Sequence, residues 1–237
     1  MLKKINKSLM NIGRLHSIEF VVIHNDAGYM KPSQYLSWLE KRNKALGIAH
    51  YYINKDEIVR VVDTYNIAYH TGEWWSNTHS IGYEICQSMV VSDQDFLLNE
   101  DITLMQVAEN MLFYGLDVNE NTVRLHHEFV PTSCPHRSMK LHGGTTASVK
   151  RYFIERIQYF MTLGKDVDTM YAKYKRKEMP NASALKKGIN IEEVAQDVIR
   201  GLYGNGKTRY ENLQKAGYKY EDVQRKVNEI LRERYRN

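Results

Sequence analysis

The feature that most constrains the fold is a short β-branched run within residues 18–24, Ile-Glu-Phe-Val-Val-Ile-His. Apolar, β-branched residues over so few consecutive positions are typical of a buried strand. The run ends at His24, and the polar residues Asn25 and Asp26 break the apolar pattern. The sequence therefore predicts a buried strand at whose end a side chain can face a cleft.

Further elements of both kinds follow along the first two thirds of the chain. The predicted strands and helices are, in chain order, two hairpin strands at 51–54 and 58–62, a strand at 80–86, and helices within 104–112 and 149–161. The third of these strands has a period of two, which puts Glu84 on the face opposite Ile81, Tyr83 and Ile85. Strands mixed with amphipathic helices predict an α/β or α+β domain built on a sheet.

Composition excludes several other classes of protein. The 237 residues are 43% hydrophobic and 26% charged, which is ordinary globular usage and excludes disordered, collagen-like and coiled-coil chains. No stretch approaches the roughly 18 consecutive apolar residues of a membrane span, and the basic start lacks the apolar segment of a secretory signal. Two cysteines, Cys86 and Cys134, cannot form a disulfide framework. We therefore expect synthesis in a cytoplasm and no membrane partner.

One run gathers residue types that bind metals. Residues 124–137 read Arg-Leu-His-His-Glu-Phe-Val-Pro-Thr-Ser-Cys-Pro-His-Arg and place His126 eight residues before Cys134. Imidazole and thiolate are preferred zinc ligands, and two of them close in sequence lower the entropic cost of closing a site. A catalytic zinc needs a third protein ligand, for which His24 is the natural candidate. Spacing alone leaves other triples open, since the chain has nine histidines.

Five pieces of the sequence, taken in order, carry a family resemblance. They are Phe-Val-Val-Ile-His ending at His24, Ile-Ala-His-Tyr-Tyr-Ile at 48–53, Ala-Tyr-His-Thr-Gly at 68–72, Ser-Ile-Gly-Tyr-Glu ending at Glu84, and the run from His126 to Pro135. Residues 16–163 thereby resemble the zinc-dependent N-acetylmuramoyl-L-alanine amidases of type 2, a family of phage lysins, bacterial muropeptide amidases and peptidoglycan-recognition proteins. The resemblance implies an α/β fold, a mixed central β-sheet flanked by helices, with Zn²⁺ held by His24, His126 and Cys134.

The same resemblance implies roles for further residues of the first domain. Glu84 stands at the family's catalytic glutamate, and its strand parity agrees independently. Thr132 stands where relatives carry Lys or Thr near the developing oxyanion, although it is also placed to pin the loop. His70 is expected to line the cleft and touch substrate. Several relatives carry a tyrosine where this chain has Ala49, so whether Tyr51 or Tyr52 substitutes stays open.

The last third of the chain has a different pattern. Residues 1–165 hold 17 basic and 17 acidic residues, so the whole formal net charge of +5 lies in residues 166–237. We assign residues 1–165 to the catalytic domain and 166–188 to a basic linker. Residues 189–237 are assigned to a small all-α module, because three short apolar periods separated by glycine breaks predict three helices.

This module resembles the cell-wall-binding repeat at the C-terminus of some phage lysins. The pattern includes Val-Ala-x-x-Val-Ile-x-Gly ending at residue 201, Tyr-Gly-Asn-Gly at 203–206 and Tyr-x-x-Val-Gln-x-x-Val-Asn at 220–228. The resemblance implies binding to bacterial peptidoglycan, and the contact candidates are Tyr203, Asn205, Arg209, Tyr218 and Tyr220. The tyrosines are equally placed to cap the core of the module. One small module binds weakly, so avidity through a homo-oligomer is a hypothesis.

Other functions remain open on the sequence alone. A non-catalytic peptidoglycan receptor on the same fold needs neither Cys134 nor Glu84, and the presence of both favours an enzyme. A cysteine hydrolase would use Cys134 as the nucleophile. A nucleic-acid partner is not expected, because the basic residues of the tail are not concentrated on one helix. As a phage-type endolysin the protein would wait in the host cytoplasm until its release to the wall; a bacterial autolysin is the alternative.

Overall fold

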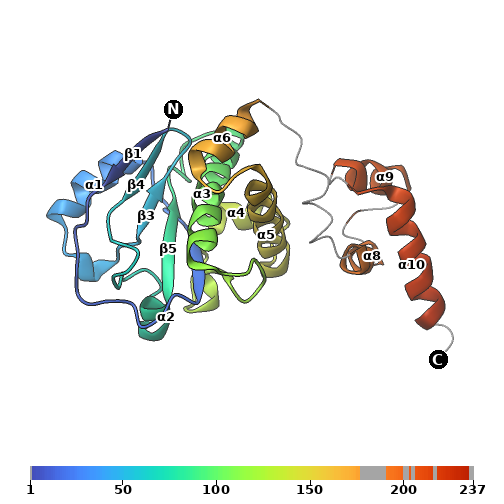
Figure 1. The fold of residues 1–237 in the computed structure, drawn as a ribbon, viewed down its shortest axis with the longest axis horizontal. Coiled ribbons are helices and arrows are strands. Elements are labelled where there is room, and N and C mark those ends of the chain that lie inside the picture. The colour runs from blue at the N-terminus through green and yellow to red at the C-terminus, as the bar shows by residue number, and fades with distance from the viewer. Residues whose placement is uncertain (1, 177–190, 200–202, 204–205, 216–217, 235–237) are drawn as a thin grey trace. The chain divides into compact units, whose positions relative to one another are not determined.

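A computed structural model describes residues 2–176, 191–199, 203, 206–215 and 218–234. The chain divides into two compact units, Met1–Asn181 and Ala182–Asn237. Figure 1 shows the first unit as a sheet between helices and the second as a group of helices. No helix in these ranges is long and apolar enough to span a bilayer.

The first unit is built on a six-stranded sheet. Its strands are β1 (Lys3–Asn6), β2 (Phe20–Asn25), β3 (Tyr51–Ile53), β4 (Glu57–Arg60), β5 (Ser80–Ile85) and β6 (Val123–Leu125). They lie in the order β1-β4-β3-β5-β2-β6, and the hairpin pair β3–β4 is antiparallel while the other pairs are parallel. All six residues of β2 are buried. The predictions of a mixed central sheet and of a buried strand that contains His24 are both confirmed.

Helices cover both faces of this sheet. They are α1 (Pro32–Lys41), α2 (Trp74–His79), α3 (Asp93–Tyr114), α4 (His136–Leu141), α5 (Thr146–Leu163) and α6 (Val167–Lys175), with short 3-10 turns η1 (Lys44–Leu46) and η2 (His126–Glu128). In Figure 1, α3 and α5 lie on one side of the strands and α1 lies on the other. Each face of the sheet packs against its own apolar core. Because side chains alternate along β5, Ile81, Tyr83 and Ile85 pack with α3 and α5. Cys86, directly after the strand, packs in the core on the α1 side.

The predicted start of the linker is wrong. Residues 167–175, assigned to the linker, form α6. Asp166 is its N-cap, and its side chain accepts a hydrogen bond from the amide of Thr169. Val167 and Met170 are fully buried in the main core. Their spacing, together with Tyr174, is that of an amphipathic helix, which outweighs the basic residues between them. The first unit therefore extends through α6, and the rest of the predicted linker lies outside the described residues.

The second unit contains three described helices, as predicted. They are α8 (Ile191–Ile199), α9 (Gly206–Lys215) and α10 (Tyr220–Arg234). Their core consists of seven buried apolar side chains: Val194, Ala195, Val198, Leu213, Val223, Val227 and Ile230. So small a core is expected to give the module only marginal stability by itself.

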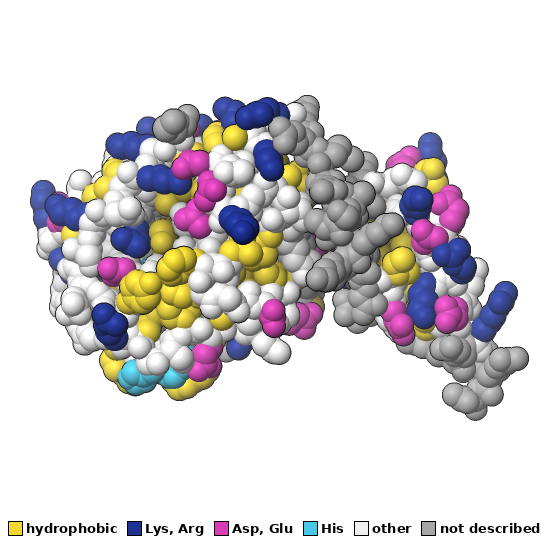
Figure 2. All heavy atoms as spheres, viewed as in Figure 1, with side chains coloured by type: hydrophobic (Ala, Val, Ile, Leu, Met, Phe, Trp, Pro, Cys, Tyr) yellow, Lys and Arg dark blue, Asp and Glu magenta, His cyan; other side chains and the backbone are white. Residues whose placement is uncertain are grey.

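Charged side chains are spread over the face of each unit that Figure 2 shows. On the face shown in Figure 2, Lys and Arg are interspersed with acidic and hydrophobic side chains among the described residues. A nucleic-acid binder instead concentrates its basic residues in a patch or stripe. This face therefore gives no support to a nucleic-acid partner.

Candidate metal centre

The three predicted metal ligands come together at the carboxyl ends of two neighbouring strands. His24 is near the end of β2, and His126 directly follows β6, which pairs with β2 in parallel. Cys134 lies in the loop that leads into α4. The candidate ligand atoms of these residues all lie within 4.8 Å of one another, and Nδ1 of His24 is 3.9 Å from Sγ of Cys134. The fold thus brings together residues that are up to 110 positions apart in the sequence.

This donor set fits a divalent transition metal such as zinc. Ligands on a tetrahedral zinc lie about 3.3–3.8 Å apart, given bond lengths of about 2.0–2.3 Å. Burial lowers the pKa of His24 and of His126, so both rings are neutral, as ligands must be. Burial also raises the pKa of the Cys134 thiol, and a bound cation offsets that cost by stabilising the thiolate. Three protein donors leave a fourth position for water or substrate.

The loop that carries Cys134 is tied to the residue after His24. The amide of Asn25 donates to Sγ of Cys134 at 3.3 Å. The side-chain oxygen of Asn25 accepts from the amides of Arg137 and Ser138, at 2.9 and 3.0 Å, and so satisfies the first turn of α4. Asn25 is not among the residues that the sequence predicts for the site, although it holds this loop in place. The available signal was its place beside His24 at the polar end of a buried strand.

Glu84 lies beside His24 on the neighbouring strand. The parallel register of β2 and β5 pairs His24 with Glu84, so both side chains point to the same face of the sheet. Oε2 of Glu84 is shielded from solvent and has no hydrogen-bond partner among the described residues. Burial, reinforced by the charge of Asp26, raises the pKa of this carboxyl to about 8. A carboxyl with a pKa near neutrality can both accept and return a proton.

Thr132 stands at the exposed edge of the same loop. Its hydroxyl oxygen accepts a hydrogen bond from the amide of Cys134 at 3.2 Å, which pins the loop. The hydroxyl proton stays available to donate outward. A surface cavity of about 480 Å³ opens here, and it is lined by His127, Thr132, Ser133, His136, Met139 and Thr146. Thr132 is therefore placed both to hold the loop and to contact a bound molecule.

The expectation that His70 lines the cleft is wrong. Only 7% of His70 is exposed. Both of its ring nitrogens are within hydrogen-bond distance of protein atoms, 3.1 Å from Nε2 of His24 and 3.2 Å from the hydroxyl of Ser80. Its ring lies against the backbone of β5 at Gly82. His70 therefore contacts the candidate ligand His24 at Nε2 and does not face a substrate.

The structure also separates the two tyrosines near Ala49. Tyr51 lies in the core on the α3 side, where it stacks on Tyr83 with ring centroids 5.1 Å apart. Tyr52 pairs in parallel register with Glu84 and so shares its face. Its buried hydroxyl accepts a hydrogen bond from the amide of Ala49 at 3.3 Å. Tyr51 is therefore excluded from the site, and Tyr52 lies on the correct face but is held in the second core.

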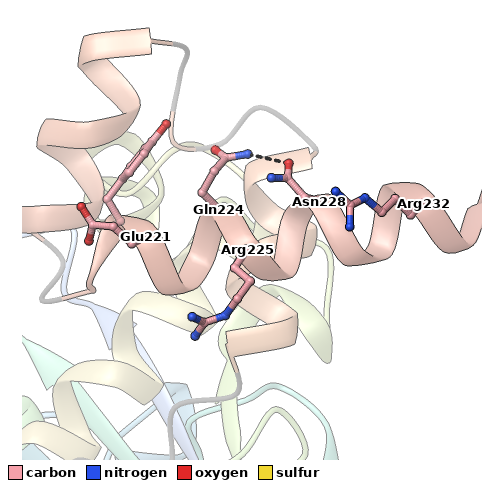
Figure 3. Close-up of a pocket in the computed structure, with 6 residues that line it drawn as sticks. Glu221, Gln224, Arg225, Asn228 and Arg232 are labelled. Carbon is pink, nitrogen blue, oxygen red and sulfur yellow. Dashed lines mark hydrogen bonds between the residues drawn. The ribbon is translucent and has the colours of Figure 1, made fainter.

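The second unit has a separate candidate site along α10. Figure 3 shows Glu221, Gln224, Arg225, Asn228 and Arg232 along this helix. With Tyr220 they line a surface pocket of about 430 Å³. Two cationic side chains next to amide groups and a tyrosine suit a ligand that carries carboxylates and hydroxyls. Five of these residues were not among the predicted contacts: Glu221, Gln224, Arg225, Asn228 and Arg232.

The predicted wall contacts divide between this pocket and the core of the module. Tyr220 lines the pocket, and Arg209 donates to the side chain of Gln224 at 3.2 Å. Tyr203 and Tyr218 pack edge to face, with ring centroids 6.3 Å apart, against the apolar core. Asn205 lies outside the described residues. The structure therefore favours the core-capping role for Tyr203 and Tyr218.

Comparison with known proteins finds two matching segments. Residues 14–137 match the N-acetylmuramoyl-L-alanine amidase family, and residues 192–231 match the CW_7 repeat. Over 163 residues the chain is 47% identical to endolysin 2638A of Staphylococcus phage 2638A. This match covers 63% of this chain and 34% of that endolysin. Over 56 residues the chain is 47% identical to the lysozyme of Streptococcus phage Cp-7. This match covers 24% of this chain and 16% of that lysozyme.

The structural comparison agrees at the level of the fold. The solution structure of the PlyG catalytic domain is similar with a TM-score of 0.56 at 21% identity, covering 66% of this chain and 94% of that domain. At this identity the likeness shows the fold alone. The chain spans about a third of the length of the phage endolysins that it matches.

Proposed function

The chain belongs to the N-acetylmuramoyl-L-alanine amidase family, and from that premise we propose that it hydrolyses the amide bond between N-acetylmuramic acid and L-alanine in bacterial peptidoglycan. The observation that carries the proposal is the position of Glu84. Its shielded and unpartnered carboxyl lies in register with His24, and His24 in turn lies beside His126 and Cys134. This arrangement supports a proton-transfer role for Glu84 beside a metal ion held by three protein donors.

The proposed chemistry assigns one task to each group. His24, His126 and Cys134 would hold zinc, which supplies a Lewis acid for the amide carbonyl and lowers the pKa of water. Glu84 accepts the proton of the attacking water at Oε2 and then returns it to the leaving amine. Thr132 donates its hydroxyl proton toward the developing oxyanion. Removal of one such donor typically lowers kcat by 10²–10³.

The second unit is proposed to bring the enzyme to its substrate. The match to the CW_7 repeat and the pocket beside Arg225 and Arg232 support a ligand from the cell wall. Stem peptides of peptidoglycan carry carboxylates, which guanidinium groups bind in a bidentate manner. We propose that the protein stays in the host cytoplasm until it is released to the wall, as for a phage endolysin. Homo-oligomerisation through this unit stays a prediction, and sedimentation at micromolar concentration tests it.

The test combines metal analysis with mass spectrometry of digested peptidoglycan. The expected products are peptides with a free N-terminal alanine and glycan strands with intact glycosidic bonds. Glu84→Gln should retain the metal and lose at least 10²-fold in rate, whereas Cys134→Ala should lose both. Full activity after treatment with a chelator would favour the thiol mechanism. If the wild-type protein binds peptidoglycan without cleaving it, the result would favour the alternative function of a non-catalytic peptidoglycan receptor.

A further inference from the structure

A chain of three hydrogen bonds runs from α2 to the candidate metal ligand His24. The hydroxyl of Ser80 donates to the carbonyl oxygen of Ser76 at 2.6 Å. Nε2 of His70 lies 3.2 Å from that hydroxyl oxygen, and Nδ1 of His70 lies 3.1 Å from Nε2 of His24. Ser76, Ser80, His70 and His24 are all buried. This series of hydrogen bonds is therefore shielded from solvent along its whole length.

The direction of each bond follows from the first one. A carbonyl oxygen can only accept, so the single hydroxyl proton of Ser80 is used on Ser76. Nε2 of His70 must then carry a proton and donate it to the hydroxyl oxygen of Ser80. A neutral imidazole has one N–H, which leaves Nδ1 of His70 as an acceptor. His24 therefore donates from Nε2, and its Nδ1 keeps a free lone pair.

We propose that His70 is a positioning residue, which holds His24 in the tautomer that presents Nδ1 to a metal ion. This inference rests on the proposed metal centre. Nδ1 is the atom of His24 that lies 3.9 Å from Sγ of Cys134. In the other tautomer, Nδ1 would carry the proton and could not bind a metal. Such outer partners commonly fix both the tautomer and the ring orientation of a histidine ligand.

The residue after His70 does the same for the other histidine ligand. The carbonyl oxygen of Thr71 lies 3.3 Å from Nε2 of His126, which must donate to it and so keeps Nδ1 free. The amides of His70 and Thr71 both donate to Oδ1 of Asn77, at 2.9 and 3.0 Å. One dipeptide, tied to α2 by one asparagine, thus orients both imidazoles.

The position of His70 also accounts for the glycine within β5. A Cβ atom at Gly82 would lie 2.6 Å from Cγ and from Nδ1 of the His70 ring. Neither atom is at the end of a flexible chain, because both belong to a buried ring. Any side chain at this position would move Nδ1 of His70 away from His24. Gly82 in β5, which permits the arrangement, therefore belongs to a different part of the chain from His70, which lies between β4 and α2.

The test compares zinc affinity in the full chain among three variants. His70→Leu removes the acceptor and should weaken zinc binding by about 10–100-fold in competition with a chromophoric chelator. His70→Asn restores an acceptor oxygen at the position of Nδ1 and should recover most of the affinity. His16→Leu, which removes an exposed histidine, is the matched control and should bind zinc as the wild type does.

A second measurement reads the tautomer directly. Long-range ¹H–¹⁵N correlation spectra of the metal-free protein should show His24 protonated at Nε2 in the wild type and in His70→Asn. In His70→Leu the Nδ1–H form should appear. If His70→Leu fails to fold, Ser80→Ala removes the acceptor for Nε2 of His70 and should shift the same signals and weaken zinc binding.

Two results would overturn the inference, and they differ from failure of the proposed function. One is wild-type zinc affinity in His70→Leu or, where that variant does not fold, in Ser80→Ala; the other is an Nδ1–H signal for His24 in the wild type. Failure of the wild-type protein itself to bind zinc would defeat the metal centre and the inference with it. A wild type that binds zinc without cleaving peptidoglycan would defeat only the proposed reaction.

Discussion

Replacing Glu84 with glutamine should stabilise the metal-free protein while it removes the proposed reaction. In the folded protein, burial raises the pKa of Glu84 to about 8, from an ordinary value of 4.5. The unfolded chain therefore releases this proton at lower pH than the folded chain does. Between these two values, each pH unit favours the unfolded state by about 1.4 kcal/mol. Glutamine cannot ionise and avoids this cost.

The size of the difference in unfolding free energy depends on how far the pH of the experiment lies above 4.5, the ordinary pKa of the carboxyl. At pH 7 the cost to the wild type is at most about 3.4 kcal/mol, and it reaches its limit above pH 8. The difference in unfolding free energy between Glu84→Gln and the wild type should therefore be small near pH 4.5 and grow with pH up to about 8. Because the pKa of this acid is higher in the folded state than in the unfolded state, the wild type loses stability as the pH rises.

Urea unfolding in the presence of a chelator, at pH values from 5 to 8, measures this difference. All three tryptophans, Trp38, Trp74 and Trp75, belong to the first unit, so their fluorescence follows the unfolding of the part that contains Glu84. Glu120→Gln, which removes an exposed carboxylate, is the control for the loss of one charge. A wild type as stable as Glu84→Gln at pH 7, or a difference that stays constant from pH 5 to pH 8, would refute the reasoning.

The remaining predictions concern the boundary of the first unit, its metal and the wall-binding pocket. Met170→Ala should lower the free energy of unfolding seen by tryptophan fluorescence by about 2–5 kcal/mol, because Met170 is fully buried in the main core; an effect no larger than that of the exposed Lys175→Ala would contradict the corrected boundary. Zinc at a hundred times its dissociation constant should stabilise the same transition by about 2.7 kcal/mol, and Cys134→Ala should abolish most of this gain in parallel urea titrations. Arg225→Ala should reduce the fraction of protein that sediments with purified cell walls while it leaves hydrolysis of a small soluble muropeptide unchanged, and equal losses in both assays would argue against a pocket that serves only the wall.

The parts of the site that the sequence predicts are those that depend on local pattern. The β-branched run before His24 and the alternation around Glu84 each lie within one strand. Period-two geometry therefore suffices to assign their faces. The loop between His126 and Cys134 is also short enough that its two ligands stay near each other however the rest of the chain folds.

The residues that were misjudged depend on contacts between segments. His70 has the same sequence context whether it faces substrate or packs against a strand, and the choice is made by the absence of a side chain at Gly82. Asn77, which holds the His70 backbone, has no motif of its own. The start of α6 was a different kind of error, because Val167 and Met170 stood at helical spacing with Asp166 before them. In that segment the apolar period, and not the basic residues, indicates the structure.

The register between β2 and β5 connects the binding, the catalysis and the stability of this site. It places Glu84 beside His24, and the same strand places Gly82 where the ring of His70 needs room. A shift of β5 by one residue would turn Glu84 into the opposite core and bring a side chain of the other face against His70. The fold can hold this register because Ile81, Tyr83 and Ile85 are fully buried on the α3 side. Burial of those three side chains therefore stabilises a fold in which the ionised carboxyl of Glu84 is unfavourable. The core thereby offsets the loss of stability that the proposed catalytic group causes.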